Sequence, residues 1–234
     1  MLRIIDARTG EPVPVRRALT RVETHVPGPG PTAPRLLLVA DTLVRALDLG
    51  STPAWAVLIT DPDGDPTALR ATAKALGTRP FEDARDDGAA RTFHVLDTGA
   101  RGGAPDGVRL VVAPVEGAAP PDTDPAVLRL ALLGSHRATP VRLDAETLTD
   151  AHDTLVRWRS AVAGWAREPS RPMPDEVRDA LRAAREDDLD TPGVLRVLRQ
   201  VEDSDLPAGA RFETYVHADR LLGLDLARDL GSPA

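Results

Sequence analysis

The fold is decided by residues 19–60, LTRVETHVPGPGPTAPRLLLVADTLVRALDLGSTPAWAVLIT. Alternating residue types over 19–26 predict a β-strand. Apolar residues then recur at helical spacing over 36–47, which predicts a helix that packs on a sheet and ends near Gly50. The apolar run over 54–60 predicts a second strand, buried on both faces. A strand, a helix and a parallel strand in this order begin a nucleotide-binding type of sheet.

The rest of the chain extends this pattern. Further strands are predicted at 92–96 and 108–113, on either side of a glycine-rich loop over 98–107. Helices are predicted at 66–76, 124–133, 144–162, 175–187, from Thr191 onward, and at 210–222. We therefore predict an α/β fold, a trimmed Rossmann-like parallel sheet followed by an α-helical bundle. The expected domains are 1–120 and 121–234.

The composition limits the chemistry. The chain has 234 residues, no cysteine and one lysine, Lys74, so 28 of its 29 basic residues are arginine. The lack of cysteine excludes disulfides, thiolate nucleophiles and zinc held by cysteine. The net charge of -7 disfavours a surface for polyanions such as tRNA. The longest apolar run, 54–59, is far shorter than the ~20 residues of a membrane span. We expect a cytoplasmic protein without a membrane segment.

Five residues are candidates for a ligand pocket. Asp61, Asp63 and Asp65 follow the second predicted strand at its carboxyl end, where α/β sheets bind ligands. With Thr60 they could hold Mg²⁺ and a nucleotide phosphate, although Asp-Pro and Asp-Gly pairs also form turns and cap helices, which is the favoured interpretation. His25, at the end of the first strand, could bind a ligand or act as a base. The simpler interpretation is a surface histidine.

Other polar and aromatic residues have structural interpretations. Four prolines in the loop 27–34 lack the N–H groups that would cradle a phosphate, so we expect a rigid linker. The pair Ser135-His136 is expected to form a joint between sheet and bundle. Trp158 and Trp165 share one helical face and are expected in the core. We predict no catalytic residue and no metal site.

A resemblance to a known family lies in five segments. The helical half contains DPAVLRLALLGSHRATP at 124–140 and EDDLDTP at 186–192. The first half contains LRIIDARTGEPV at 2–13, PGPGPT at 27–32 and LITDPDGD at 58–65. Taken in their order along the chain, these five segments resemble segments of the cysteinyl-tRNA synthetases, a class I family. The matching family segments are the opening LRLYDTLT strand, the CGPT loop, NITDIDDK, the stretch beyond the catalytic lysine loop, and the DDLNTP helix junction.

This resemblance implies a shortened relative that lacks the family's chemistry. The family's zinc binds the cysteine thiol and is held partly by cysteines, whereas Pro27 stands near the expected first ligand. The paired histidines of the HIGH motif have no counterpart between His25 and His94, and Lys74 lies far upstream of the KMSKS position. Loss of one group that stabilises a charged transition state costs ~10²–10³ in rate. We therefore predict no tRNA cysteinylation.

Two functions remain from the sequence. The first is a catalytically degenerate paralogue, a pseudo-synthetase that binds a protein partner or a small-molecule ligand. The alternative is an ATP-dependent ligase or aminoacyl-transferring enzyme with a rebuilt active site in specialised metabolism, with ATP as its cofactor. Binding of tRNA through the helical half is a third hypothesis, which the acidic charge disfavours.

Overall fold

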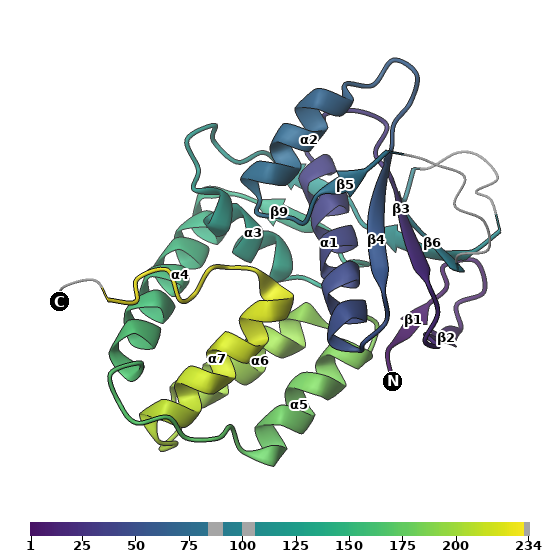
Figure 1. The fold of residues 1–234 in the computed structure, drawn as a ribbon. Coiled ribbons are helices and arrows are strands. Elements are labelled where there is room, and N and C mark those ends of the chain that lie inside the picture. The colour runs from purple at the N-terminus through teal and green to yellow at the C-terminus, as the bar shows by residue number, and fades with distance from the viewer. Residues whose placement is uncertain (84–90, 100–105, 232–234) are drawn as a thin grey trace.

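The centre of the molecule is a five-stranded parallel sheet with the strand order β5-β4-β3-β6-β7 (Figure 1). The structure is a computed structural model that describes residues 1–83, 91–99 and 106–231. The strands are β3 (Thr20–His25), β4 (Ala54–Ile59), β5 (Phe81–Glu82), β6 (Arg91–Asp97) and β7 (Val108–Val112). The predicted α/β fold, a Rossmann-like sheet followed by a helical bundle, is confirmed.

The strand order reverses at β3. From β3 the chain proceeds outward to β4 and β5, and then returns to the other side of β3 with β6 and β7. In a sheet of this kind, ligands bind outside the carboxyl ends of the strands at the point of reversal. In this chain that point lies between β3 and β6.

The two faces of β3 differ in their cover. The helix α1 (Ala33–Leu49) connects β3 to β4 and packs on β3, β4 and β6. Thr20, Val22 and Thr24 are completely buried, and we assign them to the face that α1 covers. The alternating residues of β3 are only half-buried, because they point to the other face.

Short elements surround the main sheet. The helix α2 (Pro66–Ala75) packs beside α1. The strands β1 (Arg3–Ile5) and β2 (Pro12–Pro14) pair antiparallel, and β8 (Val115–Gly117) pairs in parallel with β9 (Val141–Leu143). The sequence patterns do not predict these pairings, because strands of three residues are too short to show a period.

The second half of the chain is helical. Its helices are α3 (Pro125–Leu133), α4 (Ala145–Trp165), α5 (Asp175–Glu186), α6 (Thr191–Glu202) and α7 (Ala208–Leu222). Asp124, Asp144 and Asp190 begin α3, α4 and α6 by accepting hydrogen bonds from backbone N–H groups. The predicted helix starts at Asp124, Asp144 and Thr191 are confirmed. Within the described ranges, no helix combines the length and apolar content that crossing a membrane requires.

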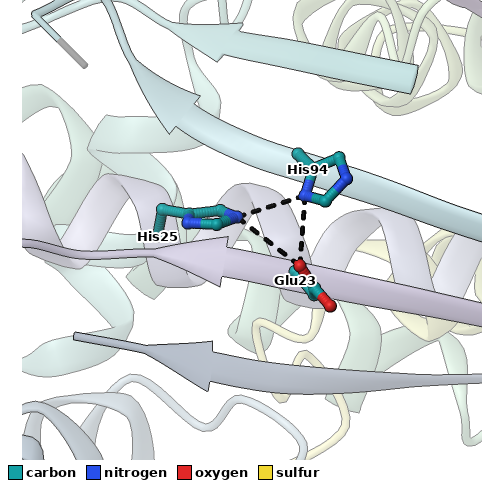
Figure 2. A group of neighbouring side chains, drawn as sticks. All are labelled: Glu23, His25 and His94. Carbon is teal, nitrogen blue, oxygen red and sulfur yellow. Dashed lines mark hydrogen bonds and ion pairs between the residues drawn. The ribbon is translucent and has the colours of Figure 1, made fainter. Parts of the chain in front are cut away.

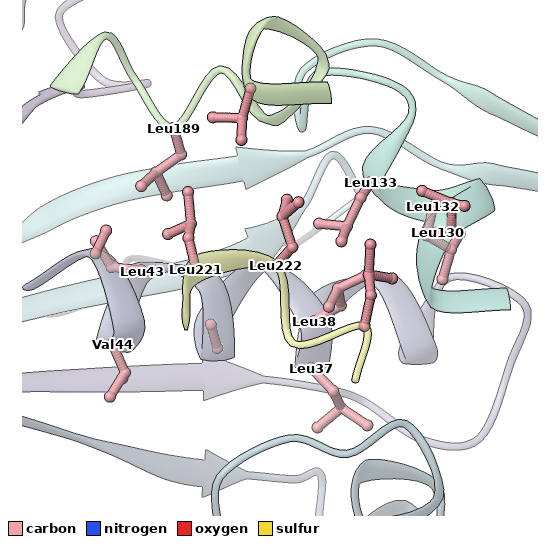
Figure 3. Packing of buried hydrophobic residues seen from close by; sticks show 14 of the residues in the cluster. Leu37, Leu38, Leu43, Val44, Leu130, Leu132, Leu133, Leu189, Leu221 and Leu222 are labelled. Carbon is pink, nitrogen blue, oxygen red and sulfur yellow. The ribbon is translucent and has the colours of Figure 1, made fainter. Parts of the chain in front are cut away.

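One hydrophobic cluster extends from the sheet into the helical half. Figure 3 shows leucines of α1 in this cluster together with Leu133 of α3 and with Leu221 and Leu222 of α7. Trp158 and Trp165 both meet the ring of Tyr215 edge-on, at centroid distances of 5.5 and 5.0 Å. The predicted core position is confirmed for Trp158, which is completely buried, whereas Trp165 is partly buried and packs against the core. Because the two predicted domains share this cluster, they pack against each other, and their boundary near residue 120 stays a prediction.

Candidate functional site

Three titratable side chains meet where β3 lies beside β6 (Figure 2). Glu23 and His25 extend from β3 and His94 from β6, and Glu23 and His94 are neighbours in the parallel register. The Nδ1 atom of His94 lies 3.2 Å from Nε2 of His25 and 3.2 Å from Oε2 of Glu23. Nε2 of His25 lies 3.7 Å from the same Oε2. These residues form what we call the Glu–His–His cluster.

The cluster owes its position to strand alternation. Glu23 and His25 are two residues apart on β3 and therefore share a face. We assign them to the face opposite α1. His25 is the last residue of β3 and lies at its carboxyl end. The cluster therefore occupies the point of strand-order reversal, where ligands bind in sheets of this type.

Burial is graded across the cluster. The His94 side chain is 1% exposed, that of Glu23 13% and that of His25 25%. His94 is thus an interior residue, while His25 is the member that solvent or a ligand can reach most easily. The ring centroids of the two histidines are 5.4 Å apart.

Neighbouring groups fix two members of the cluster. Arg21, on the same face of β3, contacts Oε1 of Glu23 at 3.0 Å, which leaves Oε2 to face the histidines. On the far side of His94, Gly107 approaches the ring so closely that a Cβ atom at this position would lie 2.8 Å from Nε2. Glycine at position 107 therefore leaves the space that the His94 ring occupies.

Both imidazoles favour the neutral form. Burial lowers the pKa of His25, and the nearby His94 lowers it further, while Glu23 acts in the opposite direction. Burial also lowers the pKa of His94, against the effects of Glu23 and of the Asp106 backbone. The Asp106 backbone lies close enough to favour the charged form of His94, but Nε2 of His94 has no hydrogen-bond partner in the described part of the chain. Neutral rings can accept a proton or bind a metal ion near pH 7.

The arrangement supports two kinds of chemistry. Two neutral imidazoles beside a carboxylate can act as a general acid and base. Two imidazole nitrogens and a carboxylate oxygen can also hold a metal ion. Within residues 1–83, 91–99 and 106–231, this is the group of three possible ligand side chains whose atoms lie within 4.8 Å of one another.

Of the predicted site residues, His25 lies in the cluster. A second histidine lies beside it. The parallel pairing of β3 with β6 brings His94, 69 residues later in the chain, into contact with it. Sequence patterns do not identify Glu23 or His94 as site residues. Strand alternation places Glu23 on the face of His25, but nothing local shows which later strand pairs with β3.

The other predicted candidates lie beyond β4 at the same edge of the sheet. Thr60, Asp61, Asp63 and Asp65 follow the strand whose last residue pairs with His25. The three acids are exposed. The backbone carbonyl of Asp61 closes a turn, and the Asp65 side chain caps α2 by accepting a backbone hydrogen bond at 2.9 Å. These contacts agree with the turn and capping interpretation. A role in binding Mg²⁺ or phosphate stays a prediction.

Two further segments singled out in the sequence are His136, which the structure describes, and the glycine-rich loop over 98–107. His136 contacts Asp188, which directly precedes α6, through Nε2 at 3.1 Å from the backbone carbonyl. Its predicted role as a joint with the helical half agrees with this contact. The glycine-rich loop lies largely outside the described residues, at 100–105.

Comparison with known proteins gives partial matches. No protein-family model matches the chain. Three curated relatives are each named L-cysteine:1D-myo-inositol 2-amino-2-deoxy-alpha-D-glucopyranoside ligase. They come from Streptosporangium roseum (40% identity over 88 residues, 38% of this chain and 21% of the relative), Catenulispora acidiphila (36% over 117, 44% and 26%) and Parafrankia sp. (40% over 113, 44% and 24%).

These matches refine the resemblance found in the motifs. The matched region spans 21–26% of the length of these three relatives. Their names describe ligases that use L-cysteine, as the cysteinyl-tRNA synthetases do, with an amino sugar as the second substrate. The chain is therefore similar, over part of its length, to ligases of cysteine.

Proposed function

We propose that this protein is a ligase-type enzyme with a rebuilt active site, which activates a carboxylic acid with ATP and joins it to an amine. The observation that carries this proposal is the Glu–His–His cluster at the point where the strand order reverses. The ligase names of the partial relatives support the reaction class. The names of these relatives favour the ligase function over the pseudo-synthetase function.

The reaction has two steps. The carboxylate attacks the α-phosphorus of ATP, which forms an acyl adenylate and releases pyrophosphate. The amine then attacks the acyl carbon, which forms an amide and releases AMP. The amine must lose a proton in the second step. While no metal ion is bound at the cluster, a neutral His25, a quarter exposed and 3.2 Å from His94, is suited to accept it.

The negative charge on the phosphates needs cationic groups. Lys74 is exposed on α2, which packs beside α1, so we assign it no role at the cluster. Arg109 on β7 is the register neighbour of His94, whereas Arg21 is paired with Glu23. Guanidinium groups pair with phosphate oxygens in a bidentate manner. We assign stabilisation of the phosphate charge to Arg109.

An exchange assay tests the proposal. We expect ATP–pyrophosphate exchange with at least one acid in a panel of amino acids and other carboxylic acids, followed by AMP release when an amine is added. His25→Asn should lower the rate of amide formation about 10²-fold or more. His152→Asn, which changes an exposed imidazole on α4, should not. Absence of exchange and of AMP release with every acid and amine would contradict the ligase function.

A non-catalytic pseudo-synthetase is the second candidate, and the composition favours it. The chain lacks cysteine and has one lysine, so the cysteine-ligated zinc site and the lysine loop of the resembling family are both missing. This function predicts no exchange but stabilisation by a bound ligand. In a thermal-shift panel of ATP, AMP, amino acids and aminoacyl sulfamoyl-adenylates, a ligand at 100 times its Kd adds ~2.7 kcal/mol to the free energy of unfolding. Measurable exchange would contradict it.

A further inference from the structure

We propose that the Glu–His–His cluster is a binding site for a divalent transition metal ion, zinc in the first place, with one coordination position open to a ligand. The ligands are Nε2 of His25, Nδ1 of His94 and Oε2 of Glu23. The site requires no cysteine. It also does not include Pro27, which stands near the position of the first zinc ligand in the cysteinyl-tRNA synthetases. It does not depend on the ligase function, because metal can bind whether or not a ligase reaction follows.

The triangle of ligand atoms has the size that zinc requires. Zinc binds nitrogen and oxygen at about 2.0–2.2 Å, so neighbouring ligands in a tetrahedral site lie ~3.3 Å apart. The three sides of the triangle are 3.2, 3.2 and 3.7 Å. The atoms therefore already form one face of a tetrahedron, and only His25, the most exposed of the three, would move by a few tenths of an ångström.

Hydrogen bonds alone cannot satisfy all three atoms of this triangle. A neutral imidazole nitrogen either carries a proton and donates or has a lone pair and accepts. Nδ1 of His94 can donate toward Glu23 or accept from His25, but it cannot do both. A cation bound to the three atoms would interact with a lone pair of each of them at once.

The surrounding groups orient the ligands as metal sites require. Outer partners that fix ligand orientation are a general feature of such sites. Arg21 holds Oε1 of Glu23 at 3.0 Å, so the remaining oxygen is directed at the histidines. His94 is 1% exposed, and the close approach of Gly107 restricts its ring. Two of the three ligands are thus held in place without the metal.

The donor set selects the metal class. Two imidazoles and one carboxylate are the protein ligands of several catalytic zinc sites and of non-haem iron. Magnesium and calcium prefer oxygen ligands throughout. With three protein ligands, the fourth position of a tetrahedral ion is left for water or a substrate atom. Arg109 is the register neighbour of His94 and Arg21 contacts Glu23, so positive charge lies beside the cluster and an anionic ligand such as a carboxylate is favoured at that position.

Zinc titration of the untagged, chelator-treated protein tests this site. We expect one zinc ion per chain by calorimetry, and the same stoichiometry by plasma mass spectrometry after dialysis. His25→Asn and Glu23→Gln should each weaken binding by more than about 100-fold, because loss of an outer partner alone costs about 10–100-fold. His152→Asn, exposed on α4, should bind as the wild type does. Co²⁺ should give the intense visible absorption of tetrahedral coordination.

Folding and function are separated by two further measurements. Circular dichroism in the presence of chelator should show that His25→Asn, Glu23→Gln and His152→Asn are all folded. Arg21→Gln removes an outer partner and no ligand, so it should weaken zinc binding only about tenfold. Failure of the exchange assay with intact zinc binding would reject the ligase function and leave the metal site standing. Wild-type protein that binds no zinc, or equal zinc affinity in wild type, His25→Asn and Glu23→Gln, would overturn the site.

Discussion

The guanidinium of Arg129 on α3 donates a hydrogen bond of 2.6 Å to the carboxylate of Asp41 on α1, and both side chains are completely buried. Arg129 also donates to the backbone carbonyls of Leu76, after α2, and Leu222, in α7. Arg45 reaches the same carboxylate at 2.8 Å. This network joins the helix that covers the sheet to the helical half of the chain.

Asp41→Ala should destabilise the fold strongly. Removing one partner of a buried ion pair leaves an uncompensated charge and costs about 3–5 kcal/mol. The free energy of unfolding from urea denaturation measures the loss. Asp179→Ala, which breaks an exposed ion pair with Arg182 on α5, should cost less than ~1 kcal/mol. Equal losses in the two variants would show that the Asp41 network does not hold the two halves together.

A second charged network joins β1 to the start of α6. The carboxylate of Asp188 accepts hydrogen bonds from Arg137 at 2.6 and 2.7 Å and from the Ile5 backbone at 2.9 Å. A hydrogen bond to Asp188 raises the pKa of His136, against the effect of burial. Burial would raise the pKa of Asp188, but the hydrogen bonds from His136 and Arg137 outweigh it and lower that pKa.

The stability that His136 contributes should depend on pH. Its pKa is higher in the folded chain than the unfolded value of about 6.5. The contribution is therefore fully present below that pH and is lost as the pH rises through the folded-state pKa. Urea unfolding of wild type and His136→Gln should differ more at about pH 5.5 than at about pH 9. The carboxylate of Asp188 stays ionised in this window. A difference that is the same at both pH values would contradict this prediction.

Gly107→Ala should weaken metal binding without removing a ligand. A Cβ atom at position 107 would lie 2.8 Å from Nε2 of His94 and 2.7 Å from the backbone oxygen of Thr92, so the ring or β7 must shift. We expect zinc affinity to fall about tenfold or more and the visible spectrum of the Co²⁺-loaded protein to change. Gly28→Ala, with no atom within 4 Å of the added Cβ, is the matched control. An unchanged spectrum in Gly107→Ala would show that this contact does not position His94.

Most of the fold could be predicted because its signals are local. The period of the apolar residues shows the helix after β3 and the buried run over 54–60 shows β4. The motif EDDLDTP correctly marks a helix start, because Asp190 caps α6 by accepting a hydrogen bond from Gly193. The same motif gives no sign that Asp188 contacts β1. Nor does it show that Asp188 and Leu189 take left-handed backbone angles, with φ of 51° and 60°.

The candidate site could not be predicted in full, because it depends on which strands pair. His25 was identifiable from its place at a strand end. Its partner His94 lies in the middle of a strand, where a histidine has no local feature that marks it as functional. Only the pairing of β3 with β6 brings the two rings together, and a non-local pairing leaves no trace in periodicity.

The central claim is that Glu23, His25 and His94 form the functional centre of this protein. A crystal of the zinc-loaded chain, measured on both sides of the zinc absorption edge, tests it most directly. We expect one anomalous peak about 2 Å from Nε2 of His25, Nδ1 of His94 and Oε2 of Glu23. A peak at other side chains, or no peak between these three atoms, would contradict the claim.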